Sequence, residues 1–118
     1  MTISSLHATA FFSEIVKNNF VWTVKDENGF PAPVSANRIR SLPFWSSYNR
    51  VCKIISIVPA YKVFTPHQIS LNEFINDWLP SLEKDKMNVG INWSGKKAVG
   101  YDMNPKDVLS RIKSLTSD

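Results

Sequence analysis

The strongest pattern in the sequence is an apolar stripe that predicts one well-defined amphipathic helix. Ser70 and Glu73 have the spacing of a capping box, in which each side chain satisfies a free backbone amide at the start of a helix. Large apolar residues then recur at intervals of three and four positions, as Leu71, Phe74, Ile75, Trp78, Leu79 and Leu82 do. Pro80 lies inside the stripe and predicts a kink or a restarted turn. A helix of this kind needs a second layer that covers its apolar face.

The rest of the chain alternates between helical and extended patterns. Helices are predicted over residues 5–19, 46–58 and 105–115, and strands over 20–24, 30–34, 38–44, 88–93 and 98–103. Residues 63–69 are a weak strand or a loop. Asn28-Gly29 favours a hairpin turn between the first two strands, the second of which is an edge or irregular strand because of Pro31 and Pro33. A chain of 118 residues has the size of one domain. We therefore predict a single α+β domain, residues 1–118, with a small, mainly antiparallel sheet packed with about four helices.

Several stretches together carry a resemblance to a known family. They are Val21-Trp22 with residues 26–30, then Pro43-Phe44-Trp45-Ser46, residues 77–85 and residues 89–93. The most specific of them is Trp-Leu-Pro-x-Leu at positions 78–82. Over nearly its whole length the chain resembles the bacterial domain of unknown function 2750 family. The resemblance implies a small bacterial α+β protein with no assigned reaction, cofactor or catalytic residues, so it assigns no functional residue here.

Positive charge is concentrated in the middle of the chain. The formal net charge is +4, yet no acidic residue occurs between Glu27 and Glu73. Arginine binds phosphate or carboxylate through two parallel hydrogen bonds, and exposed aromatic rings can stack on bases. We therefore expect a basic-aromatic contact surface, unless these residues are only an ordinary cationic surface over an aromatic core. The candidate binding residues are Arg38, Arg40, Trp45, Tyr48, Arg50 and Lys53.

Patterns that suggest catalysis are weak. Residues 90–97 match a phosphate-binding P-loop except at Lys97, where the motif needs Ser or Thr, and a hairpin with a Ser94-Gly95 turn explains them better. Cys52 lies on an apolar helical stripe and is expected to be buried and inert. Glu73 and Asp77 share a helix face but have no visible partner for acid-base work. We predict no catalytic residue, no metal site and no cofactor, and hence no enzyme.

The expected function is therefore binding. The first hypothesis is a non-enzymatic interaction protein whose partner is an acidic protein surface, and the alternative is a weak binder of nucleic acid or a phosphate ligand. No apolar run approaches the length of a membrane span, and the first residues do not form a signal peptide. The single cysteine fits a reducing compartment, so we expect the protein in the cytoplasm.

Overall fold

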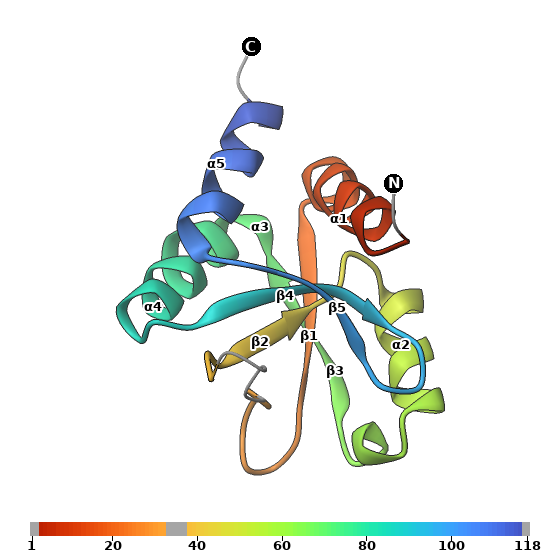
Figure 1. Ribbon diagram of the computed structural model, residues 1–118. Helices are drawn as coiled ribbons and strands as arrows, with labels where there is room; N and C mark the ends of the chain where they lie inside the picture. The colour runs from red at the N-terminus through yellow and green to blue at the C-terminus, as the bar shows by residue number, and fades with distance from the viewer. Residues whose placement is uncertain (1–2, 33–37, 117–118) are drawn as a thin grey trace.

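The computed structural model describes residues 3–32 and 38–116 and has the predicted α+β architecture (Figure 1). Its first half contains α1 (Ile3–Asn18), β1 (Phe20–Lys25), β2 (Ser41–Phe44), α2 (Tyr48–Ile57), the 3₁₀ turn η1 (Pro59–Tyr61) and β3 (Thr65–Ser70). A continuous helical segment follows, made of α3 (Leu71–Glu73), the π-helical η2 (Phe74–Trp78) and α4 (Leu79–Lys84). The chain continues through β4 (Asn88–Ser94), β5 (Val99–Met103) and α5 (Pro105–Thr116).

The strands form two small sheets that are joined at one point. β1 pairs antiparallel with β3, and the second sheet has the order β2-β4-β5, with β2 parallel and β5 antiparallel to β4. Trp22 and Trp45 link the sheets, because each backbone N–H donates to the carbonyl of the other, at 2.8 and 2.7 Å. Figure 1 shows β1 and β3 crossing the three-stranded sheet, with α1, α4 and α5 beyond one side of it and α2 at its end. The fold class predicted from the sequence is confirmed.

The predicted hairpin between the first two strands is wrong in the part that the structure describes. The turn itself forms, with Asp26 and Gly29 exchanging backbone hydrogen bonds of 3.0 and 3.1 Å. Residues 30–32 are not a strand, however, and β1 pairs along its whole length with β3, from Phe20 opposite Ser70 onward. Pro31 has no N–H to contribute to a ladder. Positions 33 and 34 of the predicted return strand lie outside the described residues.

Two groups of buried side chains make up the core. The larger group lies between the helices and the three-stranded sheet and includes Phe11, Phe44 and Phe74. The smaller group lies where α2 meets β1 and the β4–β5 hairpin, and it includes Trp45, Ile54 and Trp93 together with Val24, Val51, Val58, Tyr61 and Ala98. This second group is the floor on which the candidate site is built.

The α2 helix is rotated relative to its predicted orientation. The N-cap is Ser47, one residue after the predicted start of this helix, and its hydroxyl accepts the backbone N–H of Arg50 at 3.2 Å. The buried face carries Val51 and Ile54, whereas Cys52 is only half-buried and contacts the exposed Tyr48. The predicted burial of Cys52 is therefore wrong, because the helix face that packs on the core runs through Val51 and Ile54 and leaves Cys52 partly exposed.

The helical segment after β3 begins as predicted. Ser70 Oγ accepts the N–H of Glu73 at 3.1 Å, which is the first half of the capping box expected from the sequence. The Ser70 hydroxyl also donates to the Glu73 carboxylate at 3.2 Å. Pro80 does not end the helix. The five residues before Leu79 form a π-helical turn in which the Leu79 N–H donates to the Phe74 carbonyl, and the helical winding continues through Pro80.

Candidate functional site

The predicted surface residues fall at the two ends of β2. Arg38 and Arg40 precede the strand, and Arg50 and Lys53 lie on α2, which follows it. Four strand residues at about 3.3 Å each place roughly 13 Å of extended chain between the two pairs. Arg38 has a left-handed backbone (φ 64°), and the Arg40 guanidinium donates to the Ala32 carbonyl at 2.8 Å. The structure therefore does not bring the six candidate residues onto one surface.

Trp45 is a core residue and not a surface aromatic. It is 1% exposed, and its indole N–H donates to the Trp93 carbonyl at 2.8 Å. Such burial satisfies both the apolar ring and its single donor. Trp45 thus cannot stack on the bases of a nucleic acid, as the sequence hypothesis required. Tyr48 remains 55% exposed, with its ring 5.2 Å from that of Trp22.

A pocket of about 270 Å³ lies where the start of α1, the middle of α2 and the end of β4 meet. We call it the α1–α2 pocket. Trp45, Ile54 and Trp93 supply its apolar side, and His7, Arg50 and Lys53 are among its polar lining residues. The pocket therefore brings together three of the six predicted residues, namely Trp45, Arg50 and Lys53, and leaves out Arg38, Arg40 and Tyr48.

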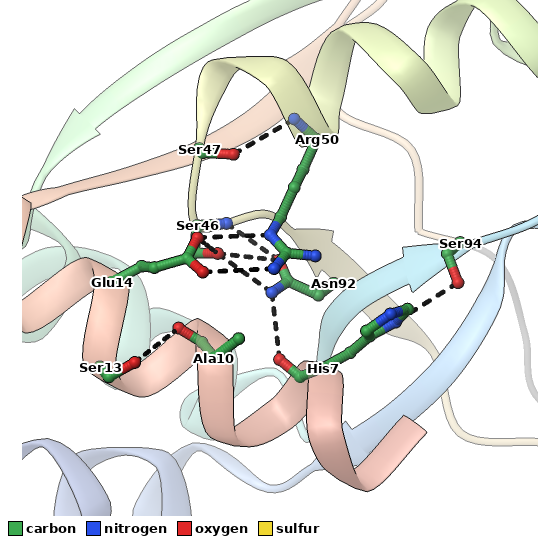
Figure 2. A network of polar contacts seen from close by, with 9 residues as sticks. All are labelled: His7, Ala10, Ser13, Glu14, Ser46, Ser47, Arg50, Asn92 and Ser94. Carbon is green, nitrogen blue, oxygen red and sulfur yellow. Dashed lines mark hydrogen bonds and ion pairs between the residues drawn. The ribbon is translucent and has the colours of Figure 1, made fainter. Parts of the chain in front are cut away.

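A polar network holds the pocket together (Figure 2). The Glu14 carboxylate on α1 accepts hydrogen bonds from Arg50 Nε and Nη2 at 3.3 and 3.2 Å, and from the Ser46 hydroxyl at 2.8 Å. Asn92 Oδ1 on β4 accepts the Ser46 N–H at 2.9 Å, and its Nδ2 donates to Ser46 Oγ at 3.0 Å and to the His7 carbonyl at 3.1 Å. Three elements distant in sequence are thereby fixed around one point.

The position of Asn92 depends on an irregularity in β4. The pairing of β4 with β5 shifts register between Ile91 and Ser94, and Asn92 within this interval has a left-handed backbone (φ 45°). Asparagine tolerates this conformation better than most residues. Asn92 is 2% exposed, so its part of the network is shielded from water, whereas the Arg50 and Glu14 side chains are 31% and 32% exposed.

The electrostatics of the pocket are set by Glu14 and Arg50. Burial by itself would raise the pKa of Glu14, but the hydrogen bonds from Arg50 and Ser46 and the charge of Arg50 outweigh it and lower this pKa. Glu14 is therefore ionised at neutral pH and balances the charge of Arg50. Lys53 is exposed on the lining, and Lys96 and Lys97 are exposed in the turn that follows Gly95. Lys53 therefore leaves the lining with an excess of positive charge.

Sequence reasoning missed the residues that organise this pocket. Glu14 lies in a predicted helix, and nothing in the sequence distinguishes it from an acidic residue exposed to solvent. His7 lines the pocket, and its backbone carbonyl accepts a hydrogen bond from Asn92. Asn92 could have been recognised from the sequence, because it is a polar residue between the apolar Ile91 and Trp93 in a predicted strand, and the structure buries all three. A buried amide in such a strand indicates a structural hydrogen-bonding role.

The remaining motifs have structural explanations. Residues 95–98 form a turn between the antiparallel strands β4 and β5, so the hairpin interpretation of the P-loop-like segment is confirmed. Glu73 belongs to the capping box, whereas Asp77 lines a different pocket. In the part of the chain that the structure describes, no helix is both long and apolar enough to cross a membrane.

Comparison with known proteins identifies a family without an assigned activity. No curated protein matches the chain. The family model described as "protein of unknown function (DUF2750)" matches residues 8–112, which include every residue of the polar network except His7. Since this match covers nearly the whole chain, the protein belongs to the DUF2750 family.

Proposed function

We propose that this protein is a non-catalytic binding protein whose α1–α2 pocket receives an acidic segment of a partner protein. The observation that carries the proposal is the composition of the pocket, in which Arg50 and Lys53 border an apolar floor of Ile54 and Trp93. Arg50 is held in one orientation by two hydrogen bonds to Glu14, which lowers the conformational entropy lost on binding. A partner segment with a carboxylate beside an apolar side chain would place the carboxylate on the cations and the apolar side chain on the floor.

The size and surroundings of the pocket favour a protein segment over nucleic acid. A volume of about 270 Å³ lies just below the usual range for small-molecule sites and fits side chains of a partner. Stacking on bases would need exposed aromatic rings, but Trp45 is buried. Arg50 already shares its charge with Glu14, which leaves fewer cations for a continuous phosphate backbone.

The test compares two fluorescent probes of equal charge, an acidic peptide that alternates Glu with Leu and a single-stranded DNA. Lys53→Glu reverses a charge in the pocket, and Lys62→Glu makes the same change in an exposed residue outside it. We expect Lys53→Glu to weaken peptide binding about tenfold and Lys62→Glu to change it less than about threefold.

Each other outcome has a definite meaning for the proposal. Equal losses in both variants would show that binding follows net charge rather than the pocket, and would contradict the proposal. DNA binding that is tighter than peptide binding and falls steeply with salt would support the nucleic-acid alternative. Absence of peptide binding to the unmodified protein would also contradict the proposal.

A further inference from the structure

A second pocket, of about 520 Å³, lies against the helical segment that follows β3 and shares no lining residue with the α1–α2 pocket. We call it the α4 pocket. Its walls combine two aromatic rings, Phe30 and Trp78, with apolar side chains such as Leu82. Asp77 and Asp85 are the acidic residues of the lining, and no Lys, Arg or His occurs among its lining residues. In a protein of net charge +4, this pocket therefore has the opposite electrostatic character to the protein as a whole.

The aromatic rings of the α4 pocket form a corner. The rings of Phe30 and Trp78 are nearly perpendicular, at 83°, with centroids 4.9 Å apart. Phe30 is 40% exposed, and Trp78 is half-buried and packed against Phe44, with centroids 5.8 Å apart. The face of an aromatic ring carries partial negative charge and attracts organic cations. Because the two rings pack edge to face, the exposed ring of Phe30 presents the more open face to a cation, and the Trp78 ring beside it is held in place by the core.

Two carboxylates border the same pocket. Asp77, Ser81 and Asp85 follow one another at intervals of four residues, so they lie along one side of the helical segment. Both aspartates are exposed. Within the described residues the ion pairs are Arg50–Glu14 and Lys106–Glu83, so neither aspartate is neutralised by a partner.

Basic residues lie next to the pocket lining, and Arg40 is the one engaged with the backbone. The His67 ring lies beside both aromatic rings, with centroids 5.4 Å from Phe30 and 6.4 Å from Trp78, and exposed Lys86 stands between the lining residues Asp85 and Met87. Arg40 donates to the carbonyl of Ala32, a lining residue, at 2.8 Å. The positive charges of Arg40 and Lys86 favour an anion, so the experiment includes an anionic probe.

The π-helical turn contributes to the arrangement. Asp77 and Trp78 are the last two residues of η2, and the segment returns to α-helix at Leu79. A π-turn inserts an extra residue into the helical ladder, which changes the direction of the side chains within it, and such turns are found frequently at functional sites. Here it places a carboxylate and an aromatic ring side by side on the wall of one pocket.

From these observations we infer that the α4 pocket binds a small organic ammonium ion with an apolar body. The ammonium group would lie between the carboxylates and the aromatic faces, and the apolar body would contact Leu82 and the rings. The inference does not depend on the proposed function of the α1–α2 pocket.

The experiment uses three probes of nearly the same shape: phenethylammonium, neutral 2-phenylethanol and anionic phenylacetate. Binding is followed by NMR from the indole N–H resonance of Trp78. We expect phenethylammonium to shift this resonance, the alcohol to bind at least about fivefold more weakly, and phenylacetate not to compete. The double variant Asp77→Asn/Asp85→Asn should abolish the preference for the cation, and Glu27→Gln, which removes an exposed carboxylate outside the pocket, should retain it.

A further variant tests the aromatic corner. Phe30 lies outside the helices and strands and is partly exposed, so Phe30→Ala should leave the fold intact and weaken phenethylammonium binding about threefold or more. Equal affinity for the three probes would reduce the pocket to an apolar cavity and overturn the inference. Tightest binding of phenylacetate would show that the pocket selects an anion, and an unchanged Trp78 resonance would show that it binds none of the probes. Either result also overturns the inference.

Discussion

At the scale of single residues, Asn92 is the residue on which the candidate site most depends. Its side-chain oxygen accepts the Ser46 backbone N–H, and its amide group donates to the Ser46 hydroxyl and to the His7 carbonyl. Aspartate would lack the donors and glycine would lack the side chain. The left-handed backbone adds a second requirement that most residues meet only at a cost. One residue therefore satisfies both the polar network and the bulge in β4.

Replacing Asn92 separates these two contributions. Asn92→Ala should lower the free energy of unfolding by about 3 kcal/mol, because it leaves buried polar groups unpaired and strains the backbone. Asn92→Gly loses the same hydrogen bonds but accepts the positive φ, so it should be about 1 kcal/mol less destabilising than alanine. Urea denaturation measures both values. Identical losses would show that the backbone of residue 92 is not strained, and a loss below about 0.5 kcal/mol would show that the network contributes little.

At the scale of elements, the β4–β5 hairpin is shaped by Trp93. The indole lies against two glycines, since a Cβ at Gly90 would be 2.5 Å from its Cε2 and Cζ2 atoms and a Cβ at Gly100 would be 2.9 Å from its Cδ1. Its N–H donates to Asp102 on β5 at 3.0 Å. Only a strand without side chains at these two positions accommodates the ring, and this ring also forms part of the floor of the α1–α2 pocket.

Adding a methyl group to the strand tests this packing. Gly90→Ala should lower the free energy of unfolding by about 1–3 kcal/mol, because the Trp93 ring has to move. The near-ultraviolet circular dichroism should change with it. Gly95→Ala is the matched control, since a Cβ there has no neighbour within 4 Å and only the positive φ (+80°) is strained. The packing argument fails if the two variants have the same near-ultraviolet spectrum.

At the scale of the whole molecule, contacts between distant segments hold the two core groups together. The ion pair between Glu14 and Arg50 connects α1 to α2, and the Trp22–Trp45 bridge connects the two sheets. Two carboxylates have opposite effects on the way in which the stability of the fold changes in acid. The pKa of Glu14 is lowered, whereas burial raises the pKa of Asp102 against the hydrogen bond from Trp93. Stability against pH therefore contains two contributions of opposite sign.

The acid response can be resolved with two isosteric variants. Glu14 stabilises the fold fully above its ordinary pKa of 4.5, and this contribution is lost as the pH falls from there through the lowered folded value. Asp102 acts in reverse, because its raised pKa lets the native state take up a proton first and gain stability as the pH falls toward 3.8. Glu14→Gln should flatten the loss of stability in acid, and Asp102→Asn should steepen it. Urea midpoints measured from pH 7 to pH 3 would contradict this if both variants changed in the same direction.

The features that the sequence determined are those set by residues a few positions apart. Ser70 caps the helix that follows β3 as predicted, and Asn104 caps α5 in the same way, because each cap joins groups three residues apart. The alternation of helices and strands followed from periodicity for the same reason, and the α+β class followed from their order. Of the candidate site, the sequence supplied Arg50 and Lys53, whose helical spacing places them on the same part of α2.

Only the tertiary structure decided which distant segments meet. β1 pairs with β3, about 45 positions further along, because pairing is selected by the surface that the whole fold buries and not by the nearest turn signal. Trp45 is buried for the same reason, although the basic residues near it in the sequence suggested that it lies on the surface. Glu14 neutralises Arg50 from 36 positions away, which no local pattern announces. Side-chain pairing and burial depend on three-dimensional proximity, so the chemistry of the pocket emerges only when the chain is folded.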